Sequence, residues 1–144
     1  MGGMGHASSI AMGIAMNTTK KVWIIDGDGA SLMHMGSMAL LGQSGLNNIV
    51  HVIINNASHE SVGGMPTVAD KIDFGKIAEG CGYKNIMKAL DEETLADSLI
   101  SLSEKRELSC LEVNVSIGAR ADLGRPTSSP KENKEEFMRF LAVK

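Results

Sequence analysis

Two aspartates separated by one glycine, Asp26 and Asp28, directly follow the apolar run Val22–Ile25. A second apolar run, Ile49–Ile54, ends in the asparagine pair 55–56. Carboxylate and amide oxygens are ligands that Mg²⁺ accepts, and a strand that leads into a helix is a common place to bind phosphate. The residue types and their positions therefore predict metal or phosphate chemistry where these two runs end.

The Asp-Gly-Asp-Gly segment is open to three other interpretations. A tight turn is one, because Asp-Gly is a preferred hairpin dipeptide, although the helical pattern that follows makes a hairpin awkward. A calcium loop of the EF-hand type fails, since Ser37 occupies the position that requires glutamate and no helix precedes the loop. The segment "IIDGDG" also resembles the phosphatase pattern of haloacid dehalogenase enzymes, which implies Asp26 as nucleophile and Asp28 as general acid, and this interpretation is the runner-up. No later acidic pair after a strand completes the magnesium site that such a phosphatase needs.

Strands and helices are expected to alternate along the chain. Further strands are predicted at Asn85–Ala89 and Leu111–Val115, and Ala57–Lys71 reads as a long polar loop. Helices are predicted around Ile10 and Ile14, at Ser31–Gln43, at Phe74–Gly80, from the N-cap Asp91 to Ser103, and from a Ser129/Glu132 capping box to Leu141. This alternation predicts an α/β fold with a parallel sheet covered by helices on both faces. Ligands of such sheets bind at the carboxyl ends of the strands.

Composition narrows the class of protein. The 144 residues predict a single domain over 1–144, and a net charge of −3 without a basic cluster argues against nucleic-acid binding. Cys81 and Cys110 lie far apart, which fits a reducing compartment better than a disulfide scaffold or a zinc ribbon. No apolar run is long enough to span a membrane, and the N-terminus lacks the basic start of a signal peptide. We therefore expect a cytoplasmic protein with no membrane partner.

The Gly-Asp-Gly motif at 27–29, followed by the asparagine pair 55–56, resembles the signature of thiamine diphosphate enzymes. The resemblance implies a Mg²⁺ ion bound by Asp28, Asn56 and the backbone carbonyl of Ser58, and this ion would hold the diphosphate of the cofactor. Backbone N–H groups at the start of the following helix would also bind the diphosphate. The cofactor-binding residues that the resemblance implies here are Gly27, Asp28, Gly29, Ala30, Ser31, Asn56, Ser58 and Ser61.

The N-terminal segment Gly2-Gly3-Met4-Gly5 resembles the Gly-x-hydrophobic-Gly loop of the same enzymes. By that resemblance Met4 would wedge beneath the cofactor, with Gly3 and Gly5 also in the cofactor site. The segments "MGHASSIAMGIA", "SVGGMPT" and "DLGRPT" narrow the resemblance to the C-terminal, diphosphate-binding domain of the phosphonopyruvate decarboxylase family. Sulfopyruvate decarboxylase subunits and acetolactate synthase share the Gly-Asp-Gly and Asn elements, and remain alternatives.

The resemblance implies a carboxy-lyase of phosphonate metabolism that converts phosphonopyruvate to phosphonoacetaldehyde and CO2, with thiamine diphosphate and Mg²⁺ as cofactors. His59 and Glu60 follow the metal-binding asparagine and are the candidate catalytic residues. We expect His59 to assist proton transfer or to contact the phosphonate. The surrounding loop would close over the site, with Gly63 and Gly64 as hinges.

The other histidines and two arginines are weaker candidates for the site. His6 could face the cofactor, whereas His34 in a helix and His51 in a strand are expected to be structural. Arg120 and Arg125 are candidate contacts for the substrate anion, because a guanidinium suits bidentate recognition of a phosphonate.

One part of the family pattern is missing. The activating glutamate of these enzymes belongs to a separate pyrimidine-binding domain, which we expect to lie outside these 144 residues. The chain is therefore expected to be one half of a larger enzyme, inactive alone and partnered by a pyrimidine-binding domain or subunit. An exposed apolar face and a homo-oligomer should follow. A non-catalytic partner domain is the last alternative.

Overall fold

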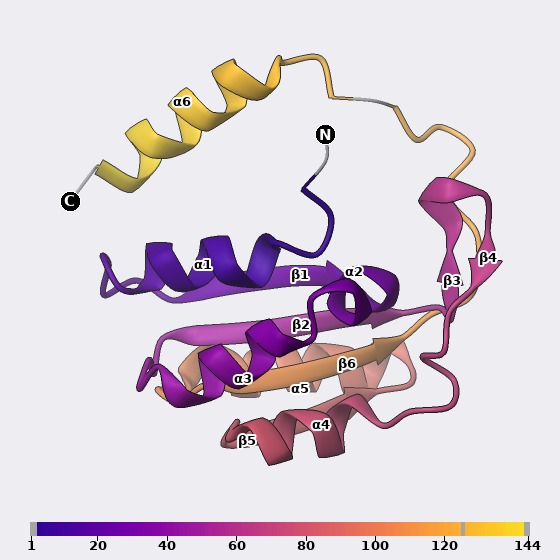
Figure 1. Cartoon of the computed structure of the whole chain (residues 1–144), viewed down its shortest axis with the longest axis horizontal. Coiled ribbons are helices and arrows are strands. Elements are labelled where there is room, and N and C mark those ends of the chain that lie inside the picture. Colours follow the sequence, from indigo (N-terminus) through magenta and orange to yellow (C-terminus); the bar gives the residue numbers. More distant parts are fainter. Residues whose placement is uncertain (1–2, 125, 143–144) are drawn as a thin grey trace.

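A computed structural model of the chain describes residues 3–124 and 126–142. Its centre is a parallel sheet with the strand order β1-β2-β6-β5 (Figure 1). The strands are β1 (Val22–Gly27), β2 (Ile49–Asn55), β5 (Asn85–Ala89) and β6 (Ser109–Asn114). The parallel sheet that the alternating pattern predicts is confirmed. Strand β1 extends beyond its predicted end and includes Asp26, and β6 begins before its predicted start.

One face of the sheet is covered by α1 (Ala7–Ala15), α3 (Gly36–Gln43) and α4 (Phe74–Cys81). Small residues on α1, such as Ala11 and Ala15, let this helix approach the strands closely. Gly42 lets α3 approach α4 closely, since a Cβ on this residue would lie 1.7 Å from the Cys81 carbonyl oxygen. The core on this face is therefore fixed by close backbone contacts as well as by large side chains.

The other face of the sheet is covered by α5 (Glu92–Glu104). Its N-terminus has the predicted cap, because Asp91 accepts from the Thr94 N–H at 2.8 Å and the Thr94 hydroxyl reaches back to the Asp91 N–H. Leu102 of α5 packs against β2 and β6, whereas Ile25 at the β1 edge stays 73% exposed. Helices thus cover both faces, and the second face is open over β1.

The helix predicted over Ser31–Gln43 is wrong as a single element. The structure has two helices, α2 (Asp28–Met33) and α3 (Gly36–Gln43), because His34 leaves the helical region with φ −132° and ψ 44°. The apolar spacing of the segment continues through this break, so periodicity could not reveal it. The early start of α2 places Asp28 in the first turn of a helix that directly follows β1.

The predicted loop Ala57–Lys71 contains a small hairpin, with β3 (Ser58–His59) paired to β4 (Met65–Pro66) around the short helix η1 (Glu60–Val62). Gly63 and Gly64 have φ of 105° and 72°, values that favour glycine, and they form the tip of this hairpin. A hinge at these glycines would move only the tip, because the base of the hairpin lies at Ala57 and Thr67, where the Thr67 N–H donates to the Ala57 carbonyl.

The C-terminal helix α6 (Pro130–Ala142) has no buried residue and lies apart from the sheet (Figure 1). Its predicted capping box is present, since Glu132 Oε2 accepts from the Ser129 N–H at 2.8 Å and Ser129 Oγ from the Glu132 N–H at 3.3 Å. Among residues 3–124 and 126–142, every helix is too short or too polar to cross a membrane.

Candidate functional site

A cavity of about 200 Å³ opens where β1 and β2 end. Every predicted site residue lines it except Gly3, Gly5 and Ser31. Residues from the N-terminal loop, the β1–α2 junction and the hairpin contribute, so segments that are distant in sequence meet here as the strand ends predict. The lining residues are Met4, Gly27, Asp28, Gly29, Ala30, Ile54, Asn56, Ser58, His59, Glu60 and Ser61.

Asp28 is the carboxylate of this cavity. It lies in the first turn of α2, where the positive end of the helix dipole favours a negative charge, and it is only 2% exposed. Its Oδ2 accepts a hydrogen bond of 2.5 Å from Thr67 Oγ1, next to β4. Thr67 is a site residue that sequence reasoning missed, because nothing in the local pattern shows which distant side chain a loop threonine contacts.

Asn56 provides an oriented amide. Its Nδ2 donates to Glu60 Oε2 at 2.5 Å, and its Oδ1 accepts from the Ser58 N–H at 3.0 Å. Glu60 also accepts from the Gly118 N–H at 2.9 Å, so it joins the hairpin to the segment after β6. The carbonyl oxygen of the amide keeps a second lone pair available to a cation. Glu60 thus contacts the amide, and its role in catalysis stays a prediction.

Two buried polar atoms in the cavity lining, Ser58 Oγ and His59 Nδ1, have no hydrogen-bond partner within the described part of the chain. Ser31 Oγ, on the helix behind the lining residue Ala30, has none there either. Buried hydroxyls are normally paired, so such atoms point to a ligand that supplies the missing partner. The Ser58 hydroxyl, beside an aspartate and an amide in the cavity lining, suits a phosphate group together with an oxygen-binding cation.

Gly29 makes room for His59. A Cβ on Gly29 would lie 2.3 Å from His59 Nδ1, so only glycine lets the imidazole ring rest against the start of α2. This contact places His59 in the cavity wall above the first turn of the helix.

The N-terminal loop packs against the other side of the same helix. Gly5 has a φ of 84°, and a Cβ there would lie 2.9 Å from the Ala30 carbonyl oxygen. The rings of His6 and His34 are 4.2 Å apart, and neither lines the cavity. Met4 does line it, at 37% exposure, whereas Gly2 of the predicted loop lies outside the described residues.

Asp26 faces the core and not the cavity. It is 6% exposed, and its Oδ2 lies 3.5 Å from His51 Nε2, while His51 Nδ1 is 3.1 Å from the Tyr83 hydroxyl. Burial raises the pKa of Tyr83, so this phenol stays neutral. A phosphatase would need Asp26 as an accessible nucleophile, and its position removes that interpretation. The structural role expected for His51 fits its burial.

The remaining predicted side chains lie away from this cavity. Arg120 is exposed and pairs with Asp122 at 3.3 Å, and Arg125 lies outside the described residues. Within the described ranges, no cluster of three or more His, Cys, Asp or Glu side chains could hold a metal. A cation at this site would therefore need the mixed set of one carboxylate, one amide and backbone or ligand oxygens that Asp28 and Asn56 offer.

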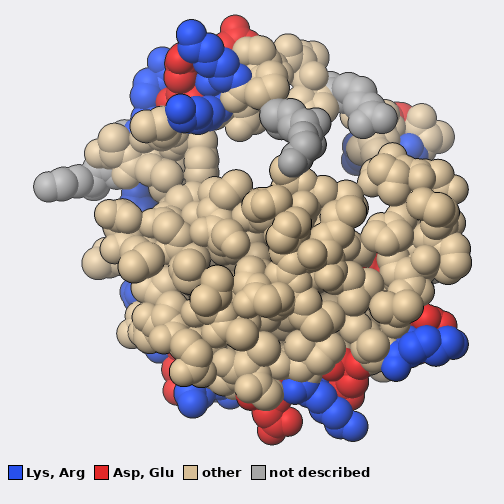
Figure 2. All heavy atoms as spheres, viewed as in Figure 1, with Lys and Arg blue, Asp and Glu red and all other residues tan. Residues whose placement is uncertain are grey.

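The face formed by α1, α2 and α3 is almost free of charged side chains (Figure 2). The sequence explains this, because no Lys, Arg, Asp or Glu occurs between Gly29 and His59. Large apolar side chains are exposed there instead, with Ile10 at 63%, Met33 at 55% and Leu40 at 60%. An uncharged apolar surface of this kind is typical of a protein interface.

Comparison with known proteins agrees with the geometry. The family described as "Thiamine pyrophosphate enzyme, C-terminal TPP binding domain" matches residues 1–113. The chain therefore belongs to the C-terminal thiamine pyrophosphate-binding domains, and the expectation of this cofactor is confirmed. The α/β fold is confirmed by a solved structure from Mycobacterium smegmatis that is described as "a putative thiamin diphosphate-dependent enzyme". It matches with a TM-score of 0.70 over 81% of this chain and 23% of that chain, at 23% identity.

The relatives that match this chain in sequence are named as decarboxylases. Phosphonopyruvate decarboxylase from Streptomyces viridochromogenes is 31% identical over 143 residues, which is 99% of this chain and 36% of that protein. Sulfopyruvate decarboxylase subunit beta from Methanocaldococcus jannaschii is 38% identical over 107 residues, which is 74% of this chain and 57% of that subunit. The chain thus spans about a third of the first relative and little more than half of the second.

Proposed function

We propose that this chain is the thiamine diphosphate- and Mg²⁺-binding part of a 2-oxo acid decarboxylase that acts on phosphonopyruvate. The observation that carries the proposal is the cavity itself. It brings Asp28 and Asn56 together with Ser58, whose hydroxyl has no hydrogen-bond partner among the described residues.

The metal would be held by Asp28, by the Asn56 amide oxygen and by the Ser58 backbone carbonyl. The Thr67 hydroxyl fixes one oxygen of Asp28, and Glu60 fixes the nitrogen of Asn56. Both ligands are thus oriented before the cation arrives, which lowers the entropy lost on binding. Backbone N–H groups in the first turn of α2, at Gly29 and Ala30, would bind the diphosphate because they lack partners within the helix.

Bound thiamine diphosphate supplies the electron sink that accepts the electron pair left by departing CO2. The chain contributes the surroundings of this chemistry. Met4 forms one wall of the cavity, and the hairpin residues Ser58, His59, Glu60 and Ser61 form another. His59, whose Nδ1 has no partner within the described residues, is positioned to deliver a proton or to contact the anionic end of the substrate.

Two phosphonopyruvate decarboxylases align over 99% and 97% of the chain, but a sulfopyruvate decarboxylase from Methanosarcina acetivorans also aligns over 99% of it at 31% identity. Phosphonopyruvate is favoured as the substrate because the segments "SVGGMPT" and "DLGRPT" resemble the phosphonopyruvate decarboxylase family. Sulfopyruvate is the second candidate, because the beta subunit from Methanocaldococcus jannaschii is more similar, at 38% identity, over a shorter stretch. Both substrates are 2-oxo acids with a second anionic group, so the reaction class is the same for either.

The uncharged face over α1, α2 and α3 is proposed to bind a pyrimidine-binding domain or subunit of the same enzyme (Figure 2). It adjoins the cavity, since α2 carries Asp28 to Ser31. A partner seated there would lie next to the mouth of the cavity, and the assembly would be an oligomer in which this face is covered.

The test is an aldehyde assay. The chain is mixed with thiamine diphosphate, Mg²⁺ and the part of the Streptomyces viridochromogenes relative that does not align with this chain. Phosphonopyruvate and sulfopyruvate are then added in separate reactions. We expect aldehyde and CO2 only when both parts are present, with phosphonopyruvate preferred. Cofactor binding without turnover of either substrate would contradict the proposed activity, and faster turnover of sulfopyruvate would reassign the substrate.

A further inference from the structure

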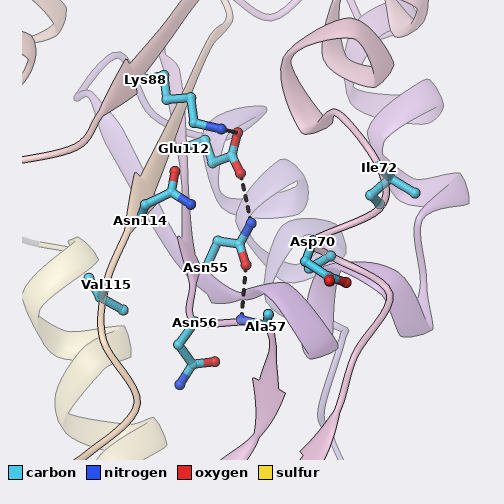
Figure 3. Close-up of a pocket in the computed structure, with 10 residues that line it drawn as sticks. Asn55, Asn56, Ala57, Asp70, Ile72, Lys88, Glu112, Asn114 and Val115 are labelled. Atoms are coloured by element: carbon cyan, nitrogen blue, oxygen red, sulfur yellow. Dashed lines mark hydrogen bonds and ion pairs between the residues drawn. The ribbon is translucent and has the colours of Figure 1, made fainter.

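A chain of polar contacts crosses the carboxyl end of the sheet from β5 to the residue after Asn56 (Figure 3). Lys88 Nζ lies 3.1 Å from Glu112 Oε2, and Glu112 Oε1 accepts from Asn55 Nδ2 at 2.7 Å. Asn55 Oδ1 then accepts from the Ala57 N–H at 3.0 Å. We call these contacts the Lys88–Ala57 relay. It lines a second cavity, of about 370 Å³, that shares Asn56 with the first.

The relay ends at a strained residue. Ala57 has a φ of 55° and is the one non-glycine residue with positive φ in the described parts of the chain. Side chains with a Cβ disfavour this conformation, so other contacts must hold it. Here the N–H of Ala57 is bound by Asn55, and its carbonyl accepts from the Thr67 N–H at 2.9 Å.

Ala57 lies between Asn56 and Ser58, the two residues of this segment that would bind the metal. Its left-handed turn reverses the chain direction locally, so it determines whether the Asn56 amide and the Ser58 carbonyl face the same point. A relaxed Ala57 with negative φ would turn one of these groups away from the other. Strained residues held in this way cluster at functional sites.

Glu112 determines how the Asn55 amide is oriented. The carboxylate is 4% exposed and needs a donor on each oxygen, which Lys88 and Asn55 provide. If the amide flipped, its oxygen would face this carboxylate and its nitrogen would face the Ala57 N–H, so both contacts would become repulsive. The Glu112 carboxylate on β6 therefore determines that Asn55 Oδ1, and not Asn55 Nδ2, contacts the Ala57 N–H.

We infer that Lys88, Glu112 and Asn55 are positioning residues, which hold Ala57 in the left-handed conformation so that Asn56 and Ser58 bind one Mg²⁺ ion together. The inference rests on the proposed function, because it assigns these residues to the metal of that site. None of the three lines the cavity that would hold the cation.

The test uses the full chain and two substitutions whose effects should be coupled. Asn55→Ala removes the contact that holds the turn, and we expect the Mg²⁺ affinity in the presence of thiamine diphosphate to fall by about tenfold. Ala57→Gly makes positive φ acceptable without the relay. The double variant Asn55→Ala/Ala57→Gly should therefore recover most of the lost affinity, whereas Ala57→Gly alone should bind like the wild type.

Calorimetry measures Mg²⁺ binding, and thermal unfolding without ligand gives a second readout of the same coupling. Asp70→Asn is the matched control, because Asp70 lines the second cavity but pairs with Lys71 outside the relay. The inference about the relay would be overturned if Asn55→Ala bound Mg²⁺ as tightly as the wild type, or if the double variant recovered no affinity. Either result would leave the proposed function intact. A wild-type chain that binds no Mg²⁺ would instead overturn the proposed function, and the metal role of the relay with it, even if the unfolding data still showed coupling.

Discussion

Thr67→Val tests whether the hairpin holds the carboxylate that the metal needs. Thr67 Oγ1 donates to Asp28 Oδ2 over 2.5 Å, and the two residues are 9% and 2% exposed. Valine has almost the same shape as threonine but no hydroxyl, so the substitution removes the donor to Asp28 without opening a cavity. It also removes the acceptor of the Ala69 N–H, a longer contact of 3.2 Å. A buried acceptor that loses its partner destabilises the fold by about 1–3 kcal/mol, and by more when the acceptor is charged.

We therefore expect Thr67→Val to lower the free energy of unfolding by about 2 kcal/mol. For a chain of this length the melting temperature should fall by about 4–8 °C. Urea denaturation followed by circular dichroism measures the loss. Thr67→Ser retains the hydroxyl and should lose clearly less. If the valine variant is as stable as the wild type, the hydrogen bond does not hold Asp28, and the idea that the hairpin orients this ligand is refuted.

Three further substitutions or probes follow from close contacts and burial. Gly29→Ala should push the His59 ring out of the cavity, since the new Cβ would lie 2.3 Å from Nδ1. Calorimetry should then show thiamine diphosphate binding weakened by about tenfold, while Gly36→Ala, with no atom within 4 Å of its Cβ, should bind normally. Gly42→Ala should destabilise the fold by about 1–3 kcal/mol or more in urea, because α3 must move off the Cys81 carbonyl. Gly13→Ala, which meets nothing within 4 Å, is its control, and equal stability of the two would contradict the packing. Burial, reinforced by the Glu112 carboxylate, raises the pKa of Cys110 to about 12. The thiol is therefore neutral at ordinary pH, and iodoacetamide should label Cys81 but spare Cys110 until the chain unfolds; labelling at equal rates in the folded protein would count against this.

The parts of the fold that follow local signals could be predicted from the sequence. The apolar runs of β1 and β2 and the caps at Asp91 and Ser129 all depend on neighbouring residues, and each is present. The break at His34 could not be predicted, because the apolar spacing continues through it. The ring of His34 packs on His6 of the N-terminal loop, a contact that only the folded chain creates.

The site residues also fall into those that the local sequence predicts and those that it does not. Asp28 and Asn56 share a cavity because neighbouring parallel strands end at the same edge of the sheet, and their residue types suggested the chemistry. Thr67, however, reaches Asp28 across 39 positions of sequence, and the Lys88–Ala57 relay joins three strands. These supporting contacts depend on the register of distant segments, and no spacing within one segment encodes them.

We propose that Asp28 and Asn56 bind a divalent ion that holds the diphosphate of thiamine diphosphate. Calorimetric titration of the cofactor into the chain, with and without Mg²⁺, tests it most directly. We predict saturable binding that requires Mg²⁺, weakened by about 100-fold or more in Asp28→Ala and Asn56→Ala and unchanged in Asp70→Asn. Binding of equal strength without Mg²⁺, or in Asp28→Ala, would contradict the claim.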